Sequence, residues 1–169
     1  MVKTASKGGR HPRQGVATEG VLETTFEQWP AGVDFGVLTD LIGYALRRAQ
    51  IAIYQDFFAT VGTLGITPQL FAALVLIEKN PGLNQSRLGR LMGVNRAAAM
   101  ALIDRLEDLG FVARAASETD KRSNTVVVTK PGLSRLSKLI DAVRKHDARV
   151  SERLTAAELV TLRNLLRKF

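Results

Sequence analysis

The feature of this sequence that most restricts its fold is the tripeptide Gly93-Val94-Asn95, which separates two short stretches with helical periodicity. Glycine commonly ends a helix in a left-handed turn, and asparagine is a preferred N-cap for the helix that follows. A second asparagine, Asn84, is placed to cap the helix before the tripeptide, which carries Leu88 and Leu91. Two helices joined by so tight a turn have the layout of a helix-turn-helix.

The segment after these helices predicts a β-hairpin with a charged tip. A polar, turn-rich octet, Ser117 to Asn124, lies between two β-prone runs at residues 111–116 and 125–129. Two short β-prone runs on either side of such a segment are typical of a hairpin. A helix-turn-helix followed by a charged hairpin is a winged helix, and we expect the wing to lie over a phosphate backbone or a minor groove.

The remaining body reads as helix. Residues 35 to about 61 are predicted to form a helix with a broad apolar stripe. Because the stripe is broad, this helix needs more than one neighbour to cover it. Thr67-Pro68 is predicted to begin the next helix, and Thr155 with Glu158 forms a capping-box pattern for the last one. The expected fold is mostly α, a winged helix-turn-helix with a two-stranded β-wing and a helical dimerisation platform. The predicted parts are an arm (1–34), a dimerisation helix (35–66), the DNA-binding region (67–132) and C-terminal dimerisation helices (133–169).

The composition favours an anionic partner. Lys and Arg total 24 against 16 Asp and Glu, a formal net charge of +8, and such an excess is typical of proteins that bind nucleic acid. The chain has no cysteine and no apolar run of membrane-spanning length. We therefore expect a cytoplasmic protein with no membrane partner, no metal site and no cofactor.

No catalytic motif emerges from the sequence, so an enzyme is not expected. The chain has two histidines, His11 and His146, which are isolated, and we expect His146 on a helix surface. Asp104, Glu107 and Asp108 could be taken for a carboxylate cluster, but they lie on a predicted helix with Arg105 between them. Solvated ion pairing is the interpretation we adopt.

The arm, residues 1–34, shows no sustained periodicity and is expected to be at least partly disordered. Its tip is either a basic tail that grasps nucleic acid or a solvated terminus. Trp29 and Pro30 are predicted to mark where the arm meets the folded body.

Residues 84–132 resemble the DNA-binding core of the MarR family of bacterial transcriptional regulators. The likeness rests on several motifs in order, and with the flanking helices it extends over roughly residues 36–169. It implies a homodimer that reads successive half-sites of a pseudo-palindromic double-stranded DNA operator. The motifs are L-x-x-x-x-G-V (Leu88 to Val94), D-R-L-E-x-x-G-F-V-x-R (Asp104 to Arg114), D-x-R (Asp120 to Arg122) and T-x-x-G (Thr129 to Gly132).

The resemblance gives roles to the wing residues. It implies that Asp120 pairs with Arg114 at the base of the wing and fixes the hairpin. Arg122, near the tip, has the reach and planar shape to enter a narrow minor groove. The remaining tip residues, which are expected to contact phosphates, are Lys121, Ser123 and Asn124.

The start of the recognition helix is rich in alanine, whose methyl group contacts thymine but offers no hydrogen bond to a base edge. Base reading therefore rests on Asn95 and Arg96, although Asn95 is at least as well explained as an N-cap alone. The candidate DNA-binding residues of the two helices are Ser86, Arg87, Asn95, Arg96, Ala97 and Ala98.

Family members often sense small aromatic or phenolic acids, or their thioesters. Tyr44, Arg47, Arg48 and Ile51 have spacings that share a helix face and suit an anionic aromatic ligand, with dimer packing as an equally good explanation. The predicted function is a sequence-specific DNA-binding regulator, a repressor released by such a ligand. The alternative is a winged-helix adapter for protein or RNA without operator specificity.

Overall fold

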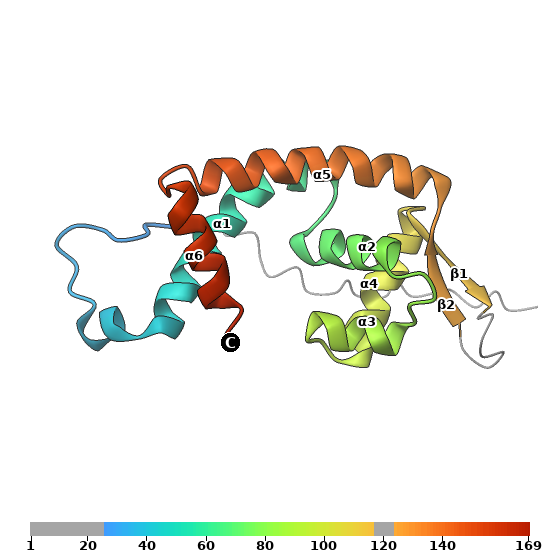
Figure 1. The fold of residues 1–169 in the computed structure, drawn as a ribbon, viewed down its shortest axis with the longest axis horizontal. Coiled ribbons are helices and arrows are strands. Elements are labelled where there is room, and N and C mark those ends of the chain that lie inside the picture. Colours follow the sequence, from blue (N-terminus) through green and yellow to red (C-terminus); the bar gives the residue numbers. More distant parts are fainter. Residues whose placement is uncertain (1–25, 117–123) are drawn as a thin grey trace, which may run out of the picture.

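In a computed structural model, residues 26–116 and 124–169 form a mostly helical chain with one two-stranded antiparallel sheet, as the sequence predicts. The long helix α5 connects two groups of elements: α2, α3, α4 and the hairpin lie at one end of it, and α1 and α6 lie at the other (Figure 1). The elements in chain order are the 3-10 turn η1 (Gly36–Asp40), α1 (Ile42–Thr60), η2 (Gly62–Leu64), α2 (Pro68–Lys79), α3 (Gln85–Met92), α4 (Arg96–Asp108), β1 (Val112–Ala116), β2 (Asn124–Val128), α5 (Lys130–Val150) and α6 (Ala156–Leu166).

The helix ends follow the capping signals of the sequence. The Thr67 hydroxyl accepts a hydrogen bond from Leu70 N (3.2 Å) at the start of α2, and Asn84 accepts from Arg87 N (2.9 Å) at the start of α3. The capping box at Thr155 and Glu158 is present in α6. These local predictions are confirmed because each depends on a few neighbouring residues.

The core lies between the helices of the winged helix and the N-terminal half of α5. Leu74 of α2 and Leu106 of α4 are completely buried, and so is Leu139 of α5, which ties the long helix to this core. Val112 and Val126 extend the core into the hairpin, whose register pairs Val112 with Val128.

A close contact joins the hairpin to α5. The Thr129 hydroxyl caps α5 by accepting from Gly132 N (3.0 Å), and it donates to the carbonyl of Gly110 (2.7 Å). Gly132 is buried against the carbonyl group of Phe111, so a side chain at this position has no space. The T-x-x-G motif therefore fixes where α5 leaves the wing.

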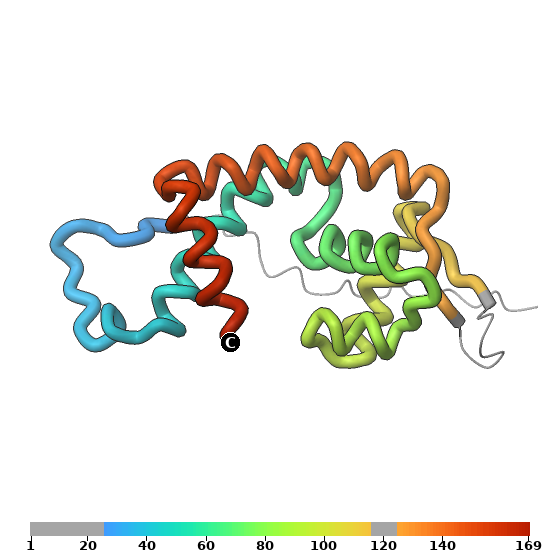
Figure 2. The backbone as a smooth tube through the Cα atoms, in the orientation of Figure 1, coloured from blue at the N-terminus to red at the C-terminus, as the bar shows by residue number. Residues whose placement is uncertain are grey.

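At the end of the molecule formed by α1 and α6, many apolar side chains are exposed. No residue of α6 is buried, and α6 with the start of α1 carries many of the exposed large apolar side chains. Figure 2 shows the chain before α1 looping out beyond α6, at the end farthest from the hairpin. In the part of the chain that the structure describes, no helix is long and apolar enough to cross a membrane.

The predicted arm is described from Phe26 onward. Residues 26–35 pack against α1 through Trp29, whose ring meets those of Phe35 (5.2 Å between centroids) and Tyr44 (6.4 Å) edge-on. Trp29 therefore packs on the folded body, and so do the neighbouring residues from Phe26 onward, which were predicted to belong to the arm.

Candidate DNA-binding surface and ligand groove

Helices α3 and α4 approach each other closely at the predicted turn. Gly93 has φ 66° and ψ 28°, a left-handed conformation that favours glycine. In α3, a side-chain carbon at Gly89 would lie 3.1 Å from Val94 O and 3.4 Å from Ala99 Cβ. The two glycines therefore allow the tight crossing that turns the first residues of α4 outward.

The predicted base-reading residues lie on that exposed turn. Asn95, Arg96 and Ala97 are exposed, and Ala98 is half-buried. The side-chain oxygen of Asn95 accepts from Ala98 N (2.8 Å), so the capping interpretation is confirmed, while base contact stays a prediction. Ser86 and Arg87, at the start of α3, are also exposed.

A contact that sequence reasoning missed connects the two helices. With its side-chain oxygen facing the guanidinium, Gln85 accepts from Arg96 Nε (3.1 Å) and Nη2 (2.9 Å). Gln85 is the first residue of α3, and nothing in its sequence spacing pairs it with Arg96. The contact therefore restricts the direction of the Arg96 guanidinium.

The base of the wing is held by α4. The guanidinium of Arg114, on β1, forms ion pairs with both Asp104 and Glu107, and Arg114 N also donates to Glu107 Oε1 (3.3 Å). The hydrogen bond to Asp104, aided by the charge of Glu107, raises the pKa of Arg114 above its ordinary value. The carboxylates form ion pairs as expected, but their partner is Arg114 on the wing rather than Arg105.

The predicted wing contacts fall mostly outside the described residues. Asp120, Lys121, Arg122 and Ser123 lie in the segment 117–123, and Asn124 is the first residue of β2. The proposed pairing of Asp120 with Arg114 therefore stays a prediction.

The four predicted ligand residues have different surroundings on α1. Tyr44 and Arg48 are joined, since Arg48 Nη1 donates to the Tyr44 hydroxyl (2.9 Å), and both contact residues of the arm. Arg47 is exposed beside Gln50, and Ile51 is half-buried. None of the four lines the groove described next.

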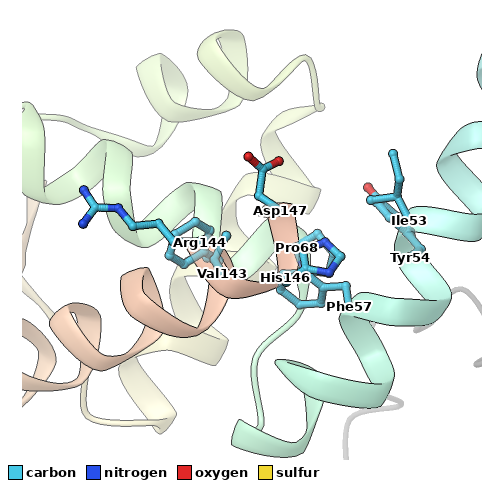
Figure 3. A pocket seen from close by; sticks show the side chains of 9 residues that line it. Ile53, Tyr54, Phe57, Pro68, Val143, Arg144, His146 and Asp147 are labelled. Carbon is cyan, nitrogen blue, oxygen red and sulfur yellow. The ribbon is translucent and has the colours of Figure 1, made fainter. Parts of the chain in front are cut away.

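An open groove of about 350 Å³ lies between α1, α2 and α5 (Figure 3). Its walls are largely apolar and aromatic. Tyr54 and Phe71 are half-buried on these walls. The residues around the groove are Ile53, Tyr54, Phe57, Pro68, Phe71, Val143, Arg144, His146 and Asp147.

The charged residues of the groove differ in their partners. Asp147 contacts Arg163 (3.4 Å). Within residues 26–116 and 124–169, no carboxylate forms an ion pair with Arg144. Arg144 is exposed and is therefore available to an anionic group in the groove.

A polar cluster supports the groove from α1. His146 Nδ1 lies 2.6 Å from Asp56 Oδ1, Arg149 Nη2 donates to the same oxygen (2.8 Å), and the His146 ring packs edge-on against Phe57. The hydrogen bonds from Arg149 and His146 lower the pKa of Asp56. His146 is only 5% exposed, so its predicted place on the helix surface is wrong. Among the described residues, no group of three or more His, Asp or Glu is arranged to hold a metal ion.

Known proteins share both the sequence and the fold. A sequence model of the MarR family matches residues 64–123. A putative transcriptional regulatory protein for the hcr operon of Thauera aromatica is 38% identical over 134 residues, 79% of this chain and 81% of that protein. The HTH-type transcriptional repressor Rv2887 of Mycobacterium tuberculosis is 33% identical over 75% of this chain and 91% of its own.

Solved structures with a similar fold come from the same kind of regulator. The transcriptional repressor CouR bound to a 23-mer DNA duplex superposes with a TM-score of 0.76 at 33% identity, covering 80% of this chain and 96% of CouR. CouR bound to p-coumaroyl-CoA gives a TM-score of 0.72 over 80% and 95% of the two chains at 31% identity. Rv2887 in complex with salicylic acid gives 0.61 over 76% and 95% at 33% identity. With its helix-turn-helix, its hairpin and these relatives, the chain belongs to the MarR family of transcriptional regulators.

Proposed function

We propose that the protein is a homodimeric, sequence-specific repressor that binds double-stranded DNA and is released by a small aromatic ligand carrying an acid or acyl-thioester group. The observation that carries the proposal is the exposed start of α4, where Arg96 is already oriented by Gln85. Arginine is the side chain most often used to read guanine in the major groove. CouR, whose fold this chain shares, is a repressor solved on a DNA duplex.

The DNA contact divides into reading and positioning. Arg96 is the proposed base-reading residue. Ser86 and Arg87, at the N-terminus of α3, are placed to contact phosphates, which fix the register but carry no sequence information. Arg122 on the wing is proposed to enter the adjacent minor groove, and Arg114 holds the strand from which the wing extends.

The proposed ligand site is the groove between α1, α2 and α5. An aromatic ring fits walls formed by side chains such as Tyr54, Phe57 and Phe71, and Arg144 is the cation for a carboxylate. Two relatives of known structure have been solved with ligands of this kind, Rv2887 with salicylic acid and CouR with p-coumaroyl-CoA. Tyr44, Arg47, Arg48 and Ile51 are not part of this proposed site, because none of them lines the groove.

The position of the groove suggests how a ligand acts on DNA binding. One wall is α2, which belongs to the winged helix, and the others are α1 and α5, which extend to the opposite end of the molecule (Figure 1). A ligand between them alters how the winged helix sits on α5. In a dimer this moves the two α4 helices away from the spacing of about 34 Å that successive half-sites require.

DNA binding is tested by fluorescence anisotropy with the duplex upstream of the protein's own gene, over a salt series. We expect tight binding that weakens steeply with salt, because several phosphates are neutralised. Arg96→Ala and Arg122→Ala should each lose affinity of the order of tenfold or more. Lys138→Ala, which removes an equal charge from the exposed face of α5, is the matched control. Binding no tighter than to competitor DNA, with all variants alike, would favour the adapter function.

Ligand binding is tested separately by isothermal titration with salicylate and p-coumarate. Arg144→Gln should weaken binding of the carboxylates, whereas Lys145→Gln, an exposed neighbour that does not line the groove, should leave it unchanged. Equal affinity in both variants would exclude Arg144 as the carboxylate partner.

A further inference from the structure

Gln85 holds the guanidinium of Arg96 along one edge. The side-chain oxygen of Gln85 accepts from Arg96 Nε (3.1 Å) and from Arg96 Nη2 (2.9 Å). A guanidinium is planar and carries five N–H donors in a fixed fork. The N–H of Nε and one N–H of Nη2 form its side edge, which Gln85 occupies. The edge at the tip, formed by Nη1 and the second N–H of Nη2, carries two parallel donors that this contact does not use.

Both side chains extend from anchored helix ends. Gln85 is half-buried at the first position of α3, directly after the N-cap Asn84. The residue before this cap, Leu83, accepts at its carbonyl from Val126 N of β2 (3.0 Å), so the hairpin fixes the start of α3. Arg96 is the first residue of α4, which also begins at a capped end. The backbone therefore fixes how the amide and the guanidinium face each other.

The partner of Arg96 is neutral. Among the residues that the structure describes, no carboxylate forms an ion pair with Arg96. A glutamate at position 85 would offer similar acceptors, but it would neutralise the guanidinium and place a negative charge near the DNA backbone. An amide restrains the arginine and leaves its full positive charge available for DNA.

The tip edge of an arginine matches one base in the major groove. Guanine presents two acceptors there, N7 and O6, whereas adenine presents one acceptor and one donor. Cytosine and thymine do not present a pair of acceptors. Two parallel N–H donors therefore pair in full with guanine only. An arginine that is not restrained can also turn toward a phosphate, and such a contact carries no sequence information.

We propose that Gln85 is a positioning residue for base reading, which holds the side edge of Arg96 so that the tip edge meets N7 and O6 of a guanine in each operator half-site. The inference deepens the proposed DNA-binding function and rests on it. It gives α3 a part in specificity besides its proposed phosphate contacts. Loss of Gln85 should therefore change which base is preferred more than how tightly DNA in general is bound.

Anisotropy with a set of operator duplexes tests this role. Full-length wild type, Arg96→Ala and Gln85→Met are compared on the duplex upstream of the protein's own gene and on every single-base-pair variant of its half-sites. Replacing one guanine should weaken wild-type binding roughly tenfold to a hundredfold. Arg96→Ala should lose that preference at the same base pair. Gln85→Met should reduce it to about threefold or less, with unchanged affinity for competitor DNA.

Gln69→Met is the matched control. It removes an amide from an exposed position near the start of α2, which forms no part of the proposed DNA contact. This variant should keep both the overall affinity and the guanine preference of the wild type.

7-Deazaguanine separates base reading from a general loss of stability. It replaces N7 by carbon and keeps O6 and the Watson–Crick pair. At the guanine identified by the variant set, it should weaken wild-type binding about tenfold and weaken Gln85→Met much less. A variant that is merely destabilised would lose affinity for both duplexes equally and keep their ratio, which would exclude the positioning role.

Gln85→Glu is the conservative replacement. It keeps acceptor oxygens at the end of a side chain of the same length, so the guanine preference should remain. Its overall affinity should fall and depend less on salt, because the positive charge of Arg96 is neutralised. If Gln85→Met does not fold, this variant decides, since loss of the guanine preference in a folded Gln85→Glu protein would contradict the role of the acceptor.

The remaining failures are distinguishable. Wild-type binding that is no tighter to the upstream duplex than to competitor DNA would refute the proposed function itself. Specific binding with the same guanine preference in Gln85→Met as in the wild type would overturn the role of Gln85 and leave the proposed function intact. The same conclusion would follow if Arg96→Ala removed a preference for a base other than guanine.

Discussion

Replacing Gly132 by alanine tests the contact that joins the wing to α5. A side-chain carbon at Gly132 would overlap the carbonyl oxygen of Phe111, lie 2.8 Å from its carbonyl carbon and lie 2.9 Å from Val128 Cγ1. Two of these three atoms belong to the backbone, so no change of side-chain rotamer relieves the overlap. Either the start of α5 or the turn between α4 and β1 has to move.

The size of the effect follows from three contributions. Forcing an extra methyl group into a packed site costs about 1–3 kcal/mol. Moving Gly132 N away from the Thr129 hydroxyl weakens an N-cap worth about 1 kcal/mol. Alanine is favoured over glycine inside a helix by about 1 kcal/mol, which offsets part of this cost. We expect Gly132→Ala to lose about 1–3 kcal/mol of unfolding free energy, or roughly 2–12 °C in Tm for a chain of this size.

Gly43→Ala is the matched control. Gly43 also lies in a helix, but nothing comes within 4 Å of an added side-chain carbon there. The control should leave stability unchanged or raise it by up to about 1 kcal/mol. Thermal and urea unfolding are measured at one protein concentration, because dimerisation makes Tm depend on concentration. If Gly132→Ala melts as high as Gly43→Ala, the argument from the Phe111 contact is wrong.

Three further predictions concern the wing, the recognition helix and the groove. Arg114→Met should reduce DNA affinity about tenfold with little change in unfolding free energy, since the pair is partly exposed; anisotropy and urea unfolding check this. Asn95→Ala should lose about 1 kcal/mol of unfolding free energy, whereas Asn95→Ser should keep it because serine also caps the helix. If Asn95→Ser nevertheless loses operator affinity selectively, Asn95 contacts a base. Because the pKa of Asp56 is lowered in the folded state, its contribution is complete above the ordinary value of 3.8 and is lost as the pH falls through the lower folded value. Wild-type stability should therefore fall more steeply below about pH 4 than that of Asp56→Asn.

The sequence by itself determined the elements and their order. Residues within one helical turn decide the N-caps at Thr67, Asn84 and Asn95 and the left-handed turn at Gly93. These features can therefore be predicted from the sequence without knowledge of the fold. The hairpin was also predictable, because its strands are close in the chain and the turn-rich octet separates them. The family motifs gave these elements their expected arrangement.

Only the tertiary structure decided which distant side chains meet. Asp104 and Glu107 looked like partners of Arg105, but helix geometry and the following turn bring them to Arg114 instead. His146 has a position typical of a solvated helix face, yet α1 covers it and supplies Asp56, which is 90 residues away in sequence.

Arg48 is a second residue whose distant contacts could not be predicted from the sequence. Its spacing from Tyr44 correctly placed the two on one face of α1, but the sequence did not show that residues 26–35 cover that face. Capping and periodicity act over three or four residues, whereas burial and ion pairing depend on which elements pack together. The local signals therefore determined the helices and the hairpin. The packing of α1 against α5 and against residues 26–35 decided which surfaces remain open to a ligand or a partner.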